Sequence, residues 1–312
     1  MLGNLEIIAP IFIIMLIGFL MGKTKVFPEG SGTARSLTSF VWFVAIPALL
    51  FKLLAANRFP TGEEFQLVLG YYFVLFIIYF SSVFFIAPRM HIEKQGVGIF
   101  AFSSCFGNLG FIGISLVQGA FGEEGLRILL MLISFHMITL LPITTLITEL
   151  ARQNSGSPLS VLFAALKRSA KNPIVVTLCI ALGWAATGIG ISPIVMRILD
   201  FPAAAAAPVG LFAVGLSLSR VKLKGNFIQA LAPVMIKLML FPVAVYFMLH
   251  LVMDVPDLWA KTATLAACMP TGMASYTIAE QYNHGTELAA STIMLGTLLS
   301  TVTLMVAISL LI

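Results

Sequence analysis

Charged residues are scarce in this chain of 312 residues. Asp, Glu, Lys and Arg make up 10% of the positions, whereas hydrophobic residues make up 59% and the mean hydropathy is +1.03. A soluble globular domain of this size carries far more charge, so the composition excludes that class. We therefore expect a polytopic protein whose main partner is the lipid bilayer.

Cysteine and the motifs of enzymes are equally sparse. Cys105, Cys179 and Cys268 lie in apolar segments without the spacing of a metal or redox site, so we expect small packing residues. No Ser/His/Asp, zinc-ligand or aspartyl-dyad spacing is present, although Ser134 and His136 share one segment. The sequence therefore predicts no enzyme, no metal and no cofactor.

Ten apolar segments are long enough to cross a bilayer. A hydrocarbon core of ~30 Å takes ~20 helical residues. The first segment begins almost at Met1 and lacks a basic leader and a convincing cleavage site, so we interpret it as a retained span. The predicted spans are 5–22, 35–56, 65–88, 96–121, 124–150, 173–190, 201–220, 227–252, 258–282 and 287–312.

The net charge of +5 lies in loops and reports orientation instead of a nucleic-acid partner. Alternate loops hold twelve Lys or Arg residues, and the opposite loops hold five. Because cytoplasmic loops retain positive charge, this predicts a cell (inner) membrane protein with both termini extracytoplasmic. The loop from Tyr282 to Glu287 is an exception, since it should be cytoplasmic but holds no Lys or Arg.

The connection from Ala151 to Asn172 divides the chain into two halves. We expect a first five-helix repeat in residues 1–152, a cytoplasmic linker in 153–172 and a second repeat in 173–312. An odd number of spans inserts the second repeat upside down, as in inverted repeats. A shift of 161 residues aligns Pro47 with Pro208, and a shift of 163 aligns Cys105, Gly122 and Glu124 with Cys268, Gly285 and Glu287.

Two helix-weakening clusters stand where spans four and nine should be regular. Proline removes a backbone donor and glycine adds freedom, so Pro270-Thr271-Gly272 predicts a break. The shift of 163 residues places Gly107-Asn108-Leu109-Gly110 opposite the Pro270 cluster. A small-residue packing face is the alternative for these glycines, but Asn108 between them favours a break. Backbone groups freed at membrane depth need protein or a watery cavity, so such breaks indicate a binding site.

These motifs resemble the auxin efflux carrier family, which includes bacterial carboxylate permeases. The resemblance rests on the segment from Asn108 to Ile114, the Pro47 span, Lys237 to Pro242, and Met269 to Tyr282. It covers the whole chain and implies ten spans, with helices four and nine broken and crossing near the midplane. It also implies a scaffold of helices one, two, six and seven, a moving core, and a homodimer through the scaffold. Ser115 stands where family members commonly carry proline.

The predicted breaks favour a small organic anion as substrate. Half-helices beginning near Gly110 and Gly272 would direct positive dipole ends toward the gap. The acidic residues avoid it, whereas Asn108 and Thr271 offer neutral hydrogen-bond donors. The predicted substrate-binding residues are Gly107, Asn108, Leu109, Gly110, Met269, Pro270, Thr271 and Gly272.

Five further residues are candidates for substrate or coupling roles. Lys237 and His136 lie deep in spans, but each has a structural alternative: a snorkelling or carbonyl-bound lysine, and a satisfied histidine. Glu280 is either a coupling site or a solvated residue near the cytoplasmic mouth. Pro47 and Pro208 complete the set.

The sequence thus predicts a secondary transporter of a small organic carboxylate, working by elevator-like alternating access around the crossing of helices four and nine. A sodium- or proton-coupled antiporter or symporter of the same architecture is one alternative. A non-transporting membrane sensor is another. The substrate, the direction of transport and the coupling ion stay open.

Overall fold

The computed structural model describes residues 2–24, 26–27, 32–55, 61–151, 157–219 and 227–312. Within these ranges the secondary structure is helical, apart from one isolated β-bridge between Gly107 and Thr271. Residue 152 and the polar start of the predicted linker, residues 153–156, lie outside the described ranges. So do six basic residues of the orientation count: Lys25, Arg58, Arg152, Arg220, Lys222 and Lys224.

The first half of the chain begins with α1 (Leu2–Lys23). Short π-helical turns, labelled η, are inserted in several of its longer helices. The elements that follow α1 are α2 (Thr33–Phe40), η1 (Val41–Ala45), α3 (Ile46–Ala55), α4 (Gly62–Ser81), η2 (Ser82–Ile86), α5 (Ala87–Arg89), the 3₁₀ turn η3 (Lys94–Gly96), α6 (Val97–Cys105), η4 (Leu109–Gly113) and α7 (Ile114–Ala151).

The second half of the chain also contains π-helical turns, η5 and η6. Asn172 caps α9, accepting a hydrogen bond from the Ile174 amide at 2.9 Å, and Gly188 ends that helix at a positive φ of 68°. The elements are α8 (Pro158–Ala170), α9 (Pro173–Thr187), α10 (Pro193–Leu218), α11 (Phe227–Met235), η5 (Ile236–Leu240), α12 (Phe241–Tyr246), η6 (Phe247–Val252), α13 (Asp257–Ala267), α14 (Ala274–Tyr282) and α15 (Thr286–Leu311).

Six helical stretches in the described residues are long and apolar enough to cross a membrane. Two shorter apolar helices, Ala9–Lys23 and Pro173–Thr187, accompany them. The chain is therefore an all-helical polytopic membrane protein, while ten spans in inverted repeats stays a prediction. The six stretches are Thr33–Ala55, Gly62–Arg89, Leu109–Ala151, Pro193–Leu218, Phe227–Val252 and Thr286–Leu311.

The longest of these stretches is not a straight rod. Gly122, inside α7, has φ 64° and ψ −154°, a conformation that only glycine adopts readily. The kink falls at the predicted boundary between spans four and five. α8 occupies most of the predicted linker and packs against α7.

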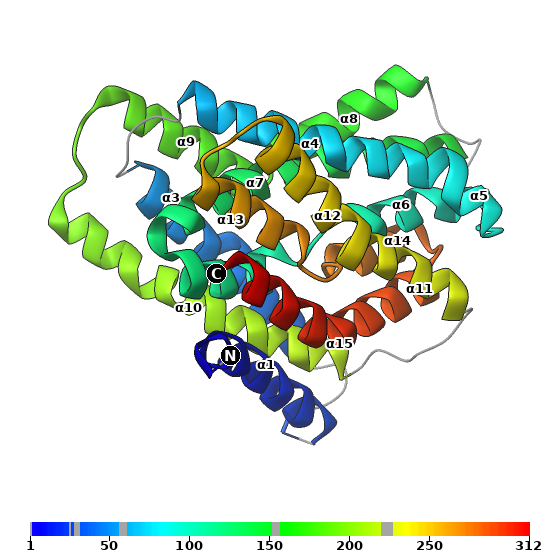
Figure 1. The fold of residues 1–312 in the computed structure, drawn as a ribbon, viewed down its shortest axis with the longest axis horizontal. Coiled ribbons are helices and arrows are strands. Elements are labelled where there is room, and N and C mark those ends of the chain that lie inside the picture. Colours follow the sequence, from blue (N-terminus) through cyan, green and yellow to red (C-terminus); the bar gives the residue numbers. More distant parts are fainter. Residues whose placement is uncertain (1, 25, 28–31, 56–60, 152–156, 220–226) are drawn as a thin grey trace.

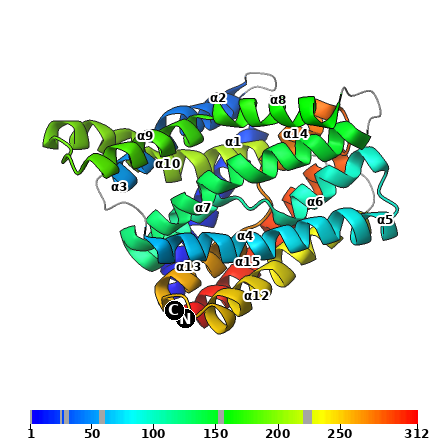
Figure 2. The same ribbon diagram turned by 90° about the horizontal axis from the view of Figure 1, so that it is seen from above.

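The helices pack in two groups. α1, α3, α9 and α10 contact mainly one another, whereas α4, α6, α7, α13 and the rod from α11 to η6 form the other group together with α15. In Figure 1, α9 and α10 reach toward the left edge, and α11, α12 and α15 lie to the right. The N-terminal end of α1 and the C-terminal end of α15 lie close together in both views (Figures 1 and 2).

Candidate substrate site at the crossing of two helix interruptions

Two non-helical segments meet in the interior of the protein. α6 ends at Cys105 and η4 begins at Leu109, while α13 ends at Ala267 and α14 begins at Ala274. The amide of Asn108 donates to the carbonyl of Pro270 at 2.7 Å, and the amide of Gly272 donates to the carbonyl of Phe106 at 3.0 Å. Each segment therefore satisfies backbone groups that the other interruption leaves free, as burial away from water requires.

Small polar side chains reinforce this crossing. The Thr271 hydroxyl donates to the Ser103 carbonyl at 2.8 Å, and the hydroxyls of Ser103 and Ser275 lie 2.7 Å apart. A Cβ atom on Gly272 would fall 2.9 Å from the Phe106 ring and 3.1 Å from the Gly107 carbonyl oxygen. The close approach of the two segments therefore requires glycine at position 272.

A cavity of about 960 Å³ extends to the crossing. Trp42 and neighbouring residues of α2 and η1, which pack against α10 of the first helix group, form one part of its wall. The crossing, α7, α14 and the start of α15 form most of the rest. Arg35, Asn172 and the exposed Glu280 also line it, which places its mouth at the ends of α2, α9 and α14. The cavity therefore lies between the two groups of helices.

The predicted binding residues divide into two sets. Gly107, Asn108, Leu109, Gly110 and Gly272 line the cavity. Met269, Pro270 and Thr271 are buried and belong to the crossing itself. The structure thus brings all eight together, but the second set supports the wall instead of forming it.

The backbone of Asn108 is held in place at the cavity wall. Asn108 precedes η4, yet its side chain makes no capping hydrogen bond to that helix. Its main chain is held on both sides, by the bond to Pro270 and by the Gly113 amide, which donates to the Asn108 carbonyl at 3.0 Å. A held backbone and an uncommitted side-chain amide in a cavity wall are suited to polar recognition.

Lys237 lies directly behind the Gly107 part of this wall. It is fully buried, and its ammonium donates to the carbonyl of Ala267, the last residue of α13. The Nζ atom lies 4.9 Å from the centroid of the Phe241 ring, and a Cβ atom on Gly107 would fall 3.3 Å from Nζ. The cation therefore occupies the negative end of a half-helix and contacts an aromatic face, two interactions that stabilise it.

His136, on α7, also lines the cavity and is almost completely buried. Its Nδ1 atom lies 3.0 Å from the Leu132 carbonyl oxygen and within hydrogen-bond distance of the Tyr72 hydroxyl. The rings of Tyr71, Tyr72 and Phe106 surround it at centroid distances of 5.4 to 5.9 Å. Its Nε2 atom is buried and has no hydrogen-bond partner among the described residues.

The two candidate prolines lie away from the cavity wall as the structure describes it. Pro47 is half-buried in α3, and Pro208 is exposed on α10, so both belong to the first helix group. Metal binding has no evident site either: the described residues contain no group of three or more His, Cys, Asp or Glu side chains suited to a metal ion. Cys105 and Cys268 are buried near the crossing, whereas Cys179 is exposed.

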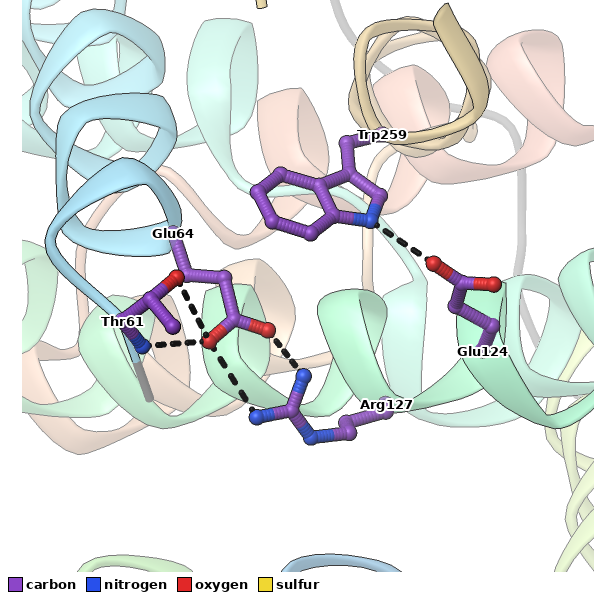
Figure 3. Close-up of polar contacts among 5 residues, drawn as sticks. All are labelled: Thr61, Glu64, Glu124, Arg127 and Trp259. Carbon is purple, nitrogen blue, oxygen red and sulfur yellow. Dashed lines mark hydrogen bonds and ion pairs between the residues drawn. The ribbon is translucent and has the colours of Figure 1, made fainter. Parts of the chain in front are cut away.

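A polar cluster that the sequence did not reveal joins α4, α7 and α13 (Figure 3). The Arg127 guanidinium pairs with the buried Glu64 carboxylate, with one N–H···O distance of 3.2 Å. The same carboxylate accepts the Thr61 amide at 2.6 Å, and the Trp259 indole donates to Glu124 at 3.0 Å. These bonds tie α4 and α13 to α7. The Thr-x-x-Glu capping-box spacing was the available sequence signal.

Comparison with known proteins identifies the family of the chain. A family model described as "Membrane transport protein" matches residues 4–308. A "Putative malonate transporter" of Rhizobium meliloti (strain 1021) is 30% identical over 305 residues, covering 95% of this chain and 92% of the relative. An uncharacterized transporter of Escherichia coli (strain K12) is 27% identical over 293 residues, covering 93% and 91%. An uncharacterized transporter of Methanocaldococcus jannaschii is 22% identical over 302 residues, covering 95% of each chain. The chain therefore belongs to the membrane transport proteins of the auxin efflux carrier family.

Proposed function

We propose that the protein is a secondary transporter that moves a small organic carboxylate across the membrane by alternating access. The observation that carries the proposal is the cavity wall at the crossing, where the Asn108 amide and the start of η4 face a hollow backed by Lys237. Hydrogen-bond donors, the positive end of a helix dipole and a buried cation all favour an anion.

The charge distribution further favours an anion over a cation. A cation carrier ordinarily places an acidic side chain at its central site. Among the described residues that line the cavity, the acidic side chains are Glu280 and Glu287, which are exposed at its mouth. The name of the relative from Rhizobium meliloti points the same way, because malonate is a small dicarboxylate.

The two helix groups suggest how access alternates. The group that contains the crossing would move as an elevator against the group of α1, α3, α9 and α10, because the cavity lies between them. In the predicted orientation the mouth beside Arg35 and Asn172 is cytoplasmic, so this conformation faces inward. Ten spans in two inverted five-helix repeats and extracytoplasmic termini belong to the same proposal.

The proposal includes a homodimer whose interface is formed by the first helix group. Phe201, Ile194 and Ile198 on α10 are 81%, 71% and 63% exposed, so α10 carries a large apolar surface for a partner or for lipid. A fixed dimeric frame would give the moving group a surface to slide against. Cross-linking of cysteine variants on α10 in native membranes tests this arrangement.

The decisive experiment measures carboxylate uptake into proteoliposomes by the parent protein and by Asn108→Asp. A new carboxylate about 4 Å from the substrate would repel it by ~4 kcal/mol at an effective dielectric of 20, or about a thousandfold in affinity. Asn108→Ala, which only removes a donor, should cost ~1–3 kcal/mol. Lower pH should partly restore binding to Asn108→Asp as its new acid is protonated.

Gln66→Glu provides the control for an added charge, because Gln66 is exposed near the start of α4 and does not line this cavity. It adds the same charge away from the described cavity wall and should leave uptake unchanged. Uptake by Asn108→Asp equal to that of the parent at neutral pH would remove Asn108 from the site. Preferential uptake of organic cations by the parent protein would overturn the substrate class.

A further inference from the structure

We infer that His136 takes up one proton together with the substrate anion, so that the protein is a proton–carboxylate symporter. This inference rests on the proposed function and specifies its coupling ion. It starts from the position of the imidazole, which lines the cavity at the crossing while remaining almost completely buried. The ring lies beside Phe106, the residue that precedes Gly107 and Asn108 in the cavity wall.

The contacts of the ring favour the tautomer that carries its hydrogen on Nδ1. The Tyr72 hydroxyl has a single proton, and it donates that proton to the Leu132 carbonyl at 2.7 Å. The Tyr72 oxygen and the Leu132 carbonyl can both accept a hydrogen bond from an N–H at Nδ1, and neither has a further hydrogen to donate. Nδ1 therefore carries the hydrogen of the neutral ring, and Nε2 is left with a lone pair and no described partner.

The surroundings of His136 contain no described acidic group that would hold a positive charge. The nearest titratable groups from the packed elements are Tyr71 and Tyr72 on α4, Cys105 at the end of α6, Lys237 on η5 and Cys268 after α13. Other elements packed against α7 carry their charges toward their ends, exposed or paired: Glu6, Lys52 with Asp200, Glu63, Glu64 with Arg127, Lys94, Lys167, Arg197, and Lys261 with Asp257.

This environment links the proton to the anion. An imidazolium enclosed by aromatic rings and near the Lys237 ammonium is unfavourable by itself, because it is desolvated and repelled. A carboxylate bound beside Nε2 supplies the missing counter-charge. Each ligand therefore strengthens the binding of the other, as thermodynamic linkage requires.

The proton transfer balances without any further reactant. On the loading side, a hydronium ion in the cavity gives a proton to the Nε2 lone pair, an N–H bond forms and a water molecule is released. The new N–H donates to the carboxylate, and Nδ1 keeps its hydrogen bond to Tyr72. On the opposite side the carboxylate leaves, and Nε2 returns the proton to water. One proton and one anion cross together.

The test measures proton uptake when malonate binds to the purified full-length protein. Calorimetric titrations in buffers of different ionisation enthalpy give the number of protons taken up per malonate. They are made at a pH well above the range in which malonate itself binds protons. We expect about one proton for the parent protein, and a dissociation constant that rises up to tenfold per pH unit as pH increases. His136→Gln should show no net uptake and no such slope.

His91→Gln is the matched control, because His91 is exposed and hydrogen-bonds only locally, near the Arg89 carbonyl. It should behave as the parent protein does. His136→Phe, which keeps a ring among the aromatic neighbours, replaces His136→Gln if that variant does not fold. Malonate binding by the parent without net proton uptake overturns the inference, and so does a His136 variant that keeps the full pH slope.

The two proposals fail in distinguishable ways. Binding without proton uptake leaves a carboxylate transporter that is not coupled through His136. If the folded parent protein binds neither malonate nor other small mono- and dicarboxylates, the proposed function and the inference that rests on it are both overturned.

Discussion

Removing the charge of Lys237 should weaken substrate binding more than it weakens the fold. Lys237→Met keeps a long unbranched side chain and deletes the ammonium behind Gly107. A carboxylate on the cavity side of Gly107 would lie ~8 Å from Nζ, given the 3.3 Å between Nζ and a Cβ atom on Gly107. At an effective dielectric of 20, two unit charges ~8 Å apart interact by ~2 kcal/mol, or about thirtyfold in affinity.

The same substitution has a separate cost for stability. It deprives the Ala267 carbonyl of its described side-chain donor and Phe241 of its cation contact, which should lower stability by ~1–3 kcal/mol. Malonate affinity and the midpoint of thermal unfolding in detergent therefore have to be measured on the same samples. Added malonate should raise the midpoint of the parent by more than that of Lys237→Met, because at a fixed concentration a ligand stabilises more the lower its dissociation constant.

Lys261→Met controls for the loss of a lysine charge. Lys261 is partly exposed and pairs with Asp257 at 2.8 Å on the first turns of α13, so both affinity and stability should change little. An unchanged malonate affinity in folded Lys237→Met would refute the reasoning. The buried ammonium would then serve only to hold the end of α13.

Three further tests address the Glu64–Arg127 pair, the crossing and the topology. Arg127→Met should lower stability by ~3–5 kcal/mol, because it leaves the Glu64 carboxylate buried without its cation. Adding Glu64→Gln to that variant should restore most of the midpoint of thermal unfolding, whereas a midpoint that does not fall in Arg127→Met argues against the pair. Gly272→Ala should reduce uptake while leaving insertion intact, because the new Cβ forces the two segments apart. Pro270→Ala should do the same by favouring a continuous helix, since proline in a helix interior costs ~3 kcal/mol. Full uptake by both variants would mean that the crossing tolerates either change. A reporter fused at Ser155 should be cytoplasmic, and one fused at the C-terminus should be external. Finding both reporters on one side of the membrane would refute the inverted-repeat proposal.

The positions of the two interruptions could be predicted because their causes are local. Proline removes a donor wherever it stands, so Pro270 marks a weak point in any helix. Glycines on both sides of Asn108 do the same less strongly. The chain is non-helical between Cys105 and Leu109 and between Ala267 and Ala274, and both clusters include residues of these segments.

Contacts between distant segments could not be derived in this way. The sequence offered Lys237 a choice between a functional role and carbonyls freed near prolines of its own helix, yet its partner is Ala267, on another helix. Glu64 reads as a residue at the edge of a span, and its burial against Arg127 depends on how α4 and α7 pack. His136 reads as satisfied or functional, and the structure shows one nitrogen satisfied and the other without a described partner. Tertiary packing decides each of these outcomes.

The contacts at the crossing indicate which parts of the protein can move together. The backbone bonds between Asn108 and Pro270 and between Gly272 and Phe106 join segments of the same helix group, as do Lys237 and Ala267. These bonds can therefore persist while that group moves against the other. Trp42 and its neighbours on η1, by contrast, line the cavity from an element that packs against α10 of the first group. A substrate held by Asn108 would travel with the crossing and exchange only its contacts with the opposite wall. Substitutions of Trp42 should therefore change the rate of transport more than the affinity for substrate, whereas substitutions of Asn108 should change affinity first.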